Sequence, residues 1–151
     1  MLLELSIKNF AIIDDLKINF TEGLNLLTGE TGSGKSIIIE ALGIVLGGRG
    51  SKDVIRTGED KAILQALFFI EDSHRVKDTL TKYGIDLEEN GLLIISREIS
   101  NMYPSISRIN GRTITGTKSY QYEKLCILTD ALNQLLKPIN RLRRGSLIVI
   151  I

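Results

Sequence analysis

The chain has 151 residues, of which 43% are hydrophobic and 25% are charged, and its formal net charge is +1. These values fit one ordinary soluble domain with a core of its own, and the net charge gives no sign of a nucleic-acid binder. The single cysteine, Cys126, excludes an internal disulfide and a cysteine metal cluster, so a reduced cytosolic setting is expected. The sequence shows neither a signal peptide nor an apolar run that could cross a membrane.

The first elements are predicted from alternation. Apolar and polar residues alternate over residues 2–8, which predicts a half-buried strand. Its inward positions are expected to be Leu3, Leu5 and Ile7. The same alternation predicts a second strand over residues 15–20. A turn over residues 21–23 then leads into an apolar third strand, residues 24–28.

Eight residues directly after the third strand have the spacing G-x-x-x-x-G-K-S, which is that of the phosphate-binding loop of P-loop nucleotidases. They are Gly29, Glu30, Thr31, Gly32, Ser33, Gly34, Lys35 and Ser36. The motif needs a strand before it and a helix after it, and the apolar residues 37–46 predict such a helix. The sequence therefore predicts a nucleotide-binding loop at residues 29–36.

The chemistry of phosphate binding explains the composition of this loop. Successive backbone N–H groups form a nest for the charged phosphates, and the N-terminus of the following helix adds its positive dipole end. The glycines allow torsions and a close approach that a Cβ would block. Lys35 is expected to reach the β- and γ-phosphates of ATP, and the Ser36 hydroxyl is expected to ligate Mg²⁺.

The helix that follows the loop is expected to be buried almost all round and to end at Gly47 and Gly48. Beyond it, a short helical turn is expected around residues 53–56. A strand is then predicted over residues 62–70, and a helix over residues 74–83.

The last clear elements are strands. An apolar run predicts a strand over residues 92–99. An Asn-Gly pair at residues 110–111 separates two strand-like runs, 105–109 and 112–115, and this is a strong signal for a hairpin. Together the elements predict an α/β fold with one mixed, mostly antiparallel sheet beside a helix at residues 35–46.

No residue is assigned a catalytic role. His74 is the only histidine and stands at a predicted helix start. It is expected to be a solvated surface residue rather than a catalytic base, because a histidine site needs partners. A basic cluster near the end of the chain is expected to be a solvated tail rather than a phosphate-contacting patch. It consists of Lys137, Arg141, Arg143 and Arg144.

Several stretches resemble the amino-terminal head segment of the SMC-like repair ATPases, and within that group the bacterial RecN family. The first two are LSIKNFAII at residues 5–13 and GLNLLTGETGSGKS at residues 23–36. The others are ALGIVLGGR at residues 41–49, IRTGE at residues 55–59, REIS at residues 97–100 and SRINGR at residues 107–112. The resemblance covers residues 1–115, which are expected to be the amino-terminal half of a head.

This resemblance implies an ABC-type ATPase head with ATP and Mg²⁺ at residues 29–36 and with Asn9 in a motif near the nucleotide. Members of the family are cytoplasmic, nucleoid-associated ATPases of recombinational DNA double-strand-break repair. In them, two heads sandwich ATP, and the full-length protein contacts DNA. The partners that the resemblance implies are therefore ATP, DNA through the full-length protein and a second head, with no membrane.

Residues 116–151 do not resemble the family and are expected to form a divergent tail, with a helix and a terminal strand. The signature motif, the Asp-Glu pair and the switch histidine of the family are not found, so we expect a truncated or frame-altered head, or a piece made for expression. ATP binding is expected, whereas hydrolysis by this chain alone is not. Either residues 146–151 fill the place beside the third strand, or the chain self-associates through an unpaired strand edge.

Two alternatives stay open. One is a small P-loop kinase, which would need an arginine-rich lid and a site for the phosphate acceptor. Arg108 and Arg112 lie on the predicted hairpin rather than in such a lid, and a kinase leaves the RecN-like stretches unexplained. The other alternative is a non-catalytic nucleotide-binding fragment, in which the fold persists without activity. A nucleotide titration combined with an ATPase assay separates these readings.

Overall fold

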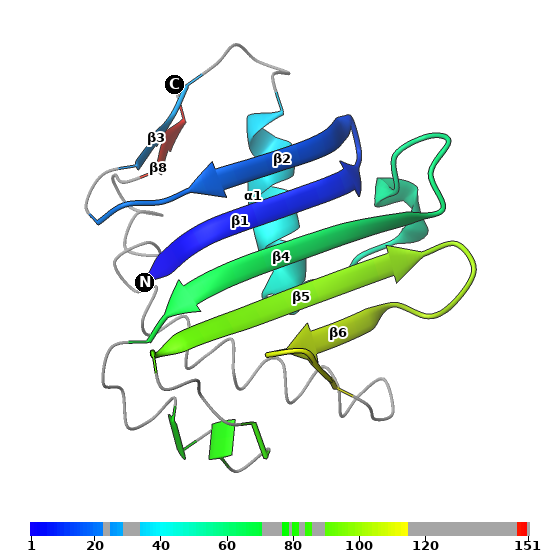
Figure 1. Cartoon of the computed structure of the whole chain (residues 1–151). Coiled ribbons are helices and arrows are strands. Elements are labelled where there is room, and N and C mark those ends of the chain that lie inside the picture. Colours follow the sequence, from blue (N-terminus) through cyan, green and yellow to red (C-terminus); the bar gives the residue numbers. More distant parts are fainter. Residues whose placement is uncertain are drawn as a thin grey trace.

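The computed structural model describes residues 1–22, 25–28, 34–70, 77–78, 80–81, 84–85, 90–114 and 148–150. In this part of the chain, helix α1 (Lys35–Val45) lies across one face of a six-stranded antiparallel sheet (Figure 1). A two-stranded sheet lies apart from the larger one. The predicted combination of an antiparallel amino-terminal sheet with a helix that begins at the phosphate loop is confirmed.

The large sheet has the strand order β2-β1-β4-β5-β6-β7, and every neighbouring pair is antiparallel. Its strands are β1 (Leu2–Phe10), β2 (Ile13–Asn19), β4 (Lys61–Phe69), β5 (Leu92–Ser100), β6 (Ile106–Ile109) and β7 (Arg112–Thr113). Each strand predicted from the sequence is present, with small differences at its ends. The Asn-Gly pair at residues 110–111 does join a hairpin, as predicted.

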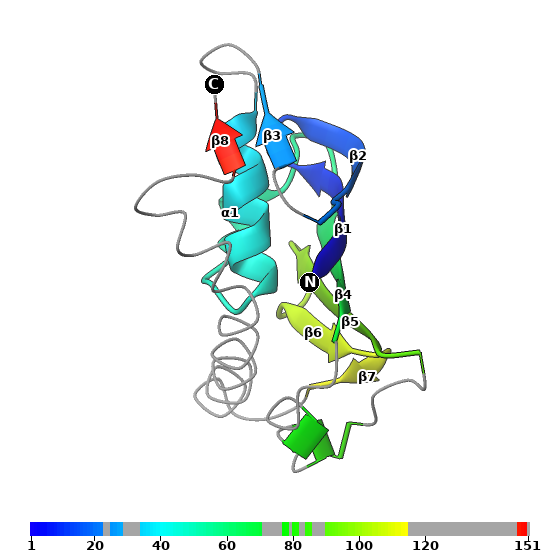
Figure 2. The same ribbon diagram turned by 90° about the vertical axis from the view of Figure 1, so that its left-hand side faces the viewer.

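One face of this sheet is apolar, and α1 covers it (Figure 2). Buried residues alternate with more exposed ones along β4 and β5. The fully buried strand residues include Leu5, Ile7, Leu64 and Ile95, and α1 adds Ala41, Ile44 and Val45. Burial of each large aliphatic side chain stabilises the fold by roughly 1.5–3 kcal/mol. This shared core therefore fixes where α1 lies on the sheet.

The start of β1 differs from the predicted alternation. Leu3 was expected to point inward with Leu5, but Leu2 is buried and Leu3 is only half-buried. The cause is a register shift in the pairing of β1 with β4 between Leu2 and Glu4. Such a bulge moves the residues before it to the other face of the sheet.

The end of α1 approaches the sheet closely because glycines follow it. The predicted helix end at residues 47–48 is confirmed, and Gly47 takes a left-handed conformation with φ of 105°. A Cβ on Gly50 would lie only 2.6 Å from the Cδ1 atom of Ile99 on β5. A larger residue at position 50 would therefore require either the Ile99 side chain or the chain after α1 to shift. The short helical turn expected nearby is a 3-10 helix, η1 (Lys52–Val54).

The prediction that α1 is buried almost all round is wrong. Ala41, Ile44 and Val45 are buried, whereas Ile39 and Glu40 are exposed. The physical reason is that α1 lies on a single sheet face, so only the residues on one side of the helix reach the core. The hydrophobicity of the helix sequence could not reveal which of its faces meets the sheet.

The strand before the phosphate loop, β3 (Asn25–Leu27), is not part of the large sheet. It pairs in parallel with β8 (Ile148–Ile150), in the register Asn25 with Ile148, Leu26 with Val149 and Leu27 with Ile150 (Figure 1). The expectation that residues near the end of the chain fill the place beside this strand is therefore confirmed for residues 148–150. The expectation of one mixed sheet is wrong, because the parallel pair forms a sheet of its own.

Some predictions concern residues outside the described part of the chain. Of the helix expected at residues 74–83, positions 77–78 and 80–81 are helical, and the others are outside the described residues. His74, Cys126 and the basic cluster between residues 137 and 144 also lie outside the described residues. The division into a head segment, residues 1–115, and a tail, residues 116–151, stays a prediction.

Arg97 is an unusual charged residue within the apolar face of the sheet. It pairs across the sheet with the buried Leu64 and is only 7% exposed. Its Nε atom is buried and has no hydrogen-bond partner in the structure as described. An unsatisfied buried donor destabilises a fold by about 1–3 kcal/mol.

Replacement of Arg97 by methionine is therefore expected to stabilise this chain. Arg97→Met keeps an unbranched apolar stem and removes the buried donor, so the midpoint of thermal unfolding should rise by a few degrees. Arg108→Met is the control, because Arg108 lies on the opposite face and pairs with Glu98. Circular dichroism melts of the three proteins provide the measurement, and a lower midpoint for Arg97→Met would contradict this account of the site.

Candidate functional site

The start of α1 brings together the part of the predicted phosphate loop that the structure describes. Gly34 is the N-cap residue, is buried, and has φ of 91° and ψ of 1°, a left-handed conformation that suits glycine. Lys35 and Ser36 form the first turn of the helix, where Lys35 is half-buried and Ser36 is exposed. The other five predicted loop residues, 29–33, lie outside the described residues.

This helix start suits an anion. The first backbone N–H groups of a helix have no acceptor within the helix, and they carry the positive end of the helix dipole. The first turn of α1 contains no acidic side chain, and no side chain caps it among the described residues. The hydroxyl of Ser36 is exposed at the same end. Among the described residues, no carboxylate therefore competes with phosphate oxygens for the first backbone N–H groups of this helix.

A tight turn between β1 and β2 lies beside this helix start. Asn9 and Ala11 have positive φ values of 53° and 51°, which are uncommon for residues other than glycine. Ile12 follows them and is 63% exposed. A Cβ placed on Gly34 would lie 3.9 Å from the Cδ1 atom of Ile12, so the turn and the helix start are neighbours.

Asn9 was expected near the nucleotide only from the family resemblance. The structure places it at the end of β1, where its Nδ2 atom donates a hydrogen bond of 2.8 Å to Glu59 Oε2. Its backbone carbonyl accepts a hydrogen bond of 3.0 Å from the Arg56 amide. Asn9 is thus part of the turn that borders the helix start, and a role for it in nucleotide binding stays a prediction.

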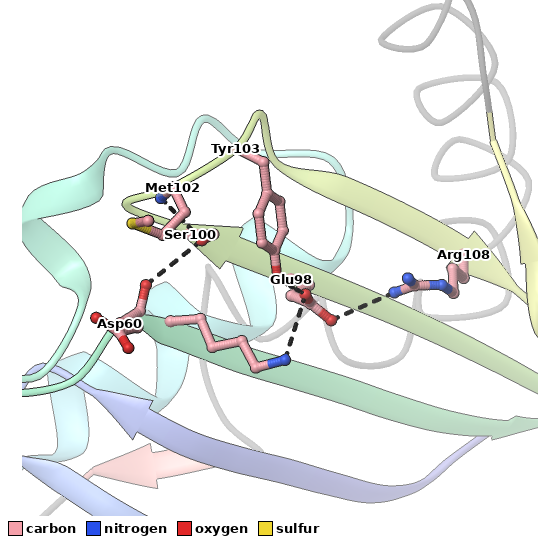
Figure 3. A network of polar contacts seen from close by, with 7 residues as sticks. Asp60, Glu98, Ser100, Met102, Tyr103 and Arg108 are labelled. Carbon is pink, nitrogen blue, oxygen red and sulfur yellow. Dashed lines mark hydrogen bonds and ion pairs between the residues drawn. The ribbon is translucent and has the colours of Figure 1, made fainter.

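A second polar cluster lies on the opposite face of the sheet, around Glu98 on β5 (Figure 3). Lys61 Nζ lies 3.5 Å from Glu98 Oε1, and Arg108 Nη1 lies 3.5 Å from Glu98 Oε2. The hydroxyl of Tyr103 also donates a hydrogen bond to Glu98. The hydrogen bond from Tyr103, helped by the charges of Lys61 and Arg108, holds the pKa of Glu98 below its usual value, although partial burial opposes this shift.

The loop that carries Tyr103 is anchored next to this cluster. The Ser100 hydroxyl lies 3.5 Å from the Asp60 carbonyl and accepts a hydrogen bond of 3.0 Å from the Met102 amide (Figure 3). Lys52 Nζ donates to the Asn101 carbonyl at 2.9 Å. These contacts join β4, β5 and the loop between β5 and β6. They stabilise the sheet and bring no nucleophile or base to the start of α1.

The family of the chain follows from a match to a family model described as an AAA domain, which covers residues 4–144. The chain belongs to the AAA domain family. Two relatives extend this assignment, and both are named DNA repair protein RecN. The protein of Bacillus subtilis (strain 168) is 49% identical over 115 residues. The protein of Vibrio cholerae serotype O1 is 37% identical over 146 residues.

The matches cover much of this chain and little of each relative. The Bacillus match covers 76% of this chain and 20% of the relative, and the Vibrio match covers 91% and 25%. The chain therefore spans about a fifth to a quarter of the length of these two relatives. The resemblance to an amino-terminal RecN segment, drawn above from the motifs, is confirmed.

A solved structure confirms the fold class. It comes from work described as the structural biochemistry of ATP-driven dimerization and DNA-stimulated activation of SMC ATPases. It superimposes with a TM-score of 0.65 and 28% sequence identity, and the match covers 87% of this chain and 79% of that one. The fold is therefore that of the amino-terminal half of an SMC-type ATPase head, as the resemblance implied.

Two negative findings concern the described residues alone. In this part of the chain, no helix is long and apolar enough to span a membrane. The same residues contain no group of three or more histidine, cysteine, aspartate or glutamate side chains that could hold a metal ion.

Sequence reasoning missed the contribution of residues 54–59 to this region. Val54 and Arg56 contact the turn at residues 9–12 across more than forty positions of sequence. No sequence pattern within either segment indicates that the two segments are in contact. The one available signal was the pair of resemblance stretches at residues 5–13 and 55–59, which indicated that both segments matter but not that they meet.

The lowered pKa of Glu98 leads to a prediction about acid stability. Because the folded-state pKa is lower than the unfolded value, ionised Glu98 stabilises the fold fully above the usual glutamate pKa of about 4.3. This stabilisation is lost as the pH falls through the lower folded-state pKa. Glu98→Gln should be less stable than the wild type at pH 7 and should lose less stability between pH 5 and pH 3.

Denaturant unfolding at a series of pH values provides the measurement. Glu40→Gln, on the exposed side of α1, controls for the loss of one carboxylate. Parallel stability profiles for the wild type and Glu98→Gln between pH 5 and pH 3 would show that Glu98 does not cause the loss of folding stability at acid pH.

Proposed function

We propose that this chain is the ATP-binding segment of a RecN-like protein of recombinational DNA double-strand-break repair. The observation that carries the proposal is the start of α1. Gly34 takes a left-handed conformation at the N-cap, and Lys35 and Ser36 follow it in the first turn. These residues are the last three of the phosphate-loop motif, and a helix start of this kind binds phosphate oxygens through its backbone N–H groups.

The other residues of the proposed site are those of the motif. Gly29, Glu30, Thr31, Gly32 and Ser33 precede the helix start in the sequence and would supply the rest of the backbone nest around the phosphates. Lys35 would place its ammonium group against the terminal phosphates. Ser36 would ligate Mg²⁺ through its hydroxyl, with the phosphate oxygens as further ligands.

The fit of Mg²⁺ to these residues rests on ligand chemistry. Mg²⁺ prefers oxygen ligands and usually keeps several waters when it is bound with a nucleotide. The exposed Ser36 hydroxyl at the helix start is an oxygen ligand of this type. A site of this kind needs no cluster of protein carboxylates, because the nucleotide itself supplies negatively charged oxygens.

The role in DNA repair belongs to a longer protein. We include in the proposal that this protein is cytoplasmic, contacts DNA and pairs two heads around ATP. The support is the family assignment, the RecN relatives and the likeness to an SMC ATPase described by ATP-driven dimerization. The near-neutral charge of this chain argues that DNA contact by this segment alone is weak.

Lys35→Ala is expected to weaken binding of ATP with Mg²⁺ by about tenfold to a hundredfold, because one charge-assisted hydrogen bond contributes about 1.5–3 kcal/mol. Isothermal titration calorimetry measures the affinity. Lys8→Ala, which removes an exposed lysine on the opposite face of the sheet, is the matched control. Equal affinities for the wild type and Lys35→Ala would refute the assignment of this lysine.

Ser36→Ala is expected to change how binding depends on Mg²⁺ rather than to abolish binding. Removal of the hydroxyl takes one ligand from the metal and leaves the backbone N–H groups in place. The affinity for ATP should therefore respond less to added Mg²⁺ than it does in the wild type. Ser6→Ala, on β1 of the large sheet, controls for the loss of a serine hydroxyl. An unchanged response to Mg²⁺ would rule out the ligand role.

A further inference from the structure

Strand β3, which leads into the phosphate loop, is held by pairing more than by packing. It is three residues long, and none of its residues belongs to the hydrophobic core. Leu26 is 48% exposed, and Asn25 and Leu27 are half-buried. Because a strand of this length gains little from burial, it keeps its extended shape only where its N–H and C=O groups are paired. The position of β3 therefore depends on its partner in the sheet.

The two ends of β3 are held by different parts of the chain. At the start, the Thr21 amide donates to Asn25 Oδ1 at 2.9 Å, and Asn25 Nδ2 donates to the Thr21 carbonyl at 2.8 Å. These bonds tie the start of β3 to the residues that follow β2. At the end, Leu27 pairs with Ile150 of β8, and among the described strands β8 is the only partner of β3. The end of β3 nearest the phosphate loop is therefore held by β8.

The strand β8 lies outside the part of the chain that matches the family. It spans Ile148–Ile150, whereas the family model covers residues 4–144. It runs parallel to β3, so the two strands lie side by side and point the same way (Figure 2). The partner of the strand before the phosphate loop is thus supplied by residues beyond the family match.

A phosphate loop binds tightly when both of its ends are fixed. The packing of α1 on the large sheet fixes the end at Gly34. The other end begins at Gly29, two residues after Leu27. Amide groups stabilise an anion best when they already point at it, and a loop that must be ordered during binding loses affinity through the entropy of ordering. A partner that fixes β3 therefore raises the affinity of the loop for phosphates.

We propose that β8 is a positioning element of the phosphate site, which holds β3 and thereby orders the entrance to the loop. This inference rests on the proposed function, because it needs phosphates at residues 29–36. It adds that residues 148–150 act on the ligand through β3. By linkage, withdrawal of β8 from β3 lowers the affinity for the nucleotide, and a bound nucleotide favours the pairing of β3 with β8 to the same extent.

The test removes β8 in two ways. The first variant lacks residues 148–151. The second, Val149→Pro, keeps the length of the chain and removes the amide in the middle of β8, where a paired strand tolerates proline poorly. Val149→Thr is the matched control, because threonine is also β-branched and favours strands. Calorimetry measures the affinities of the whole chain and the three variants for ATP and for inorganic tripolyphosphate, each with Mg²⁺.

Two further measurements separate positioning of the loop from a general effect on folding. Circular dichroism melts report on the large sheet and α1, whose core, among the described residues, contains none from β3. Hydrogen exchange at the amides of β3, with the amides of β1 as the internal reference, reports whether β3 is held in place. Both measurements use the same four proteins.

The proposal predicts about a tenfold loss of affinity for both ligands in the shortened chain and in Val149→Pro, and affinities within about twofold of the wild type in Val149→Thr. In the first two variants, exchange at β3 should be faster, while the midpoint of thermal unfolding stays within about 2 °C of the wild type.

Three results would overturn the proposal. The first is unchanged affinity in both disruptive variants. The second is unchanged exchange at β3, which would show that β8 does not hold this strand. The third is a loss of affinity together with a lower midpoint of unfolding, which would show that β8 supports the whole fold rather than the loop. A wild-type chain that binds neither ligand would instead overturn the proposed function on which the inference rests.

Discussion

The packing of α1 on one face of the large sheet is the constraint on which the rest of the structure depends. Ala41, Ile44 and Val45 reach the apolar face, and the glycine at position 50 lets the chain after the helix approach Ile99 closely. Because the end of α1 is fixed in this way, its start is fixed too. A phosphate loop needs such a fixed helix start, since its amide groups stabilise charge only when they already point at the phosphates.

The same packing explains why disfavoured backbone torsions occur in the turn between β1 and β2. Phe10 is fully buried in the core, so the chain must reverse immediately after it to begin β2 at Ile13. Left-handed torsions at Asn9 and Ala11 make this reversal, and the contacts from residues 54–59 hold them. The core of the sheet, the turn and the helix start are therefore held together by direct contacts, although they come from three parts of the sequence.

The sequence predicted the features that depend on local pattern. Alternation located β1 and β2, apolar runs located β3 and β5, and the Asn-Gly pair at residues 110–111 located the hairpin between β6 and β7. The spacing of the motif placed Gly34 at the helix start, where its left-handed torsion confirms the need for glycine. Local pattern could not reveal the bulge that buries Leu2, because a bulge depends on pairing with β4. For the same reason it could not reveal the contact of Arg56 with Ile12, which joins residues far apart in the chain.

The central claim is that a nucleotide binds at the start of α1. Amide chemical shifts of the ¹⁵N-labelled chain, followed during titration with ADP and Mg²⁺, test this claim most directly. The account predicts that the largest shift changes occur at residues 34–36, with little change around Glu98 on the opposite face of the sheet. Changes centred on the Glu98 cluster, or none at the start of α1, would contradict it.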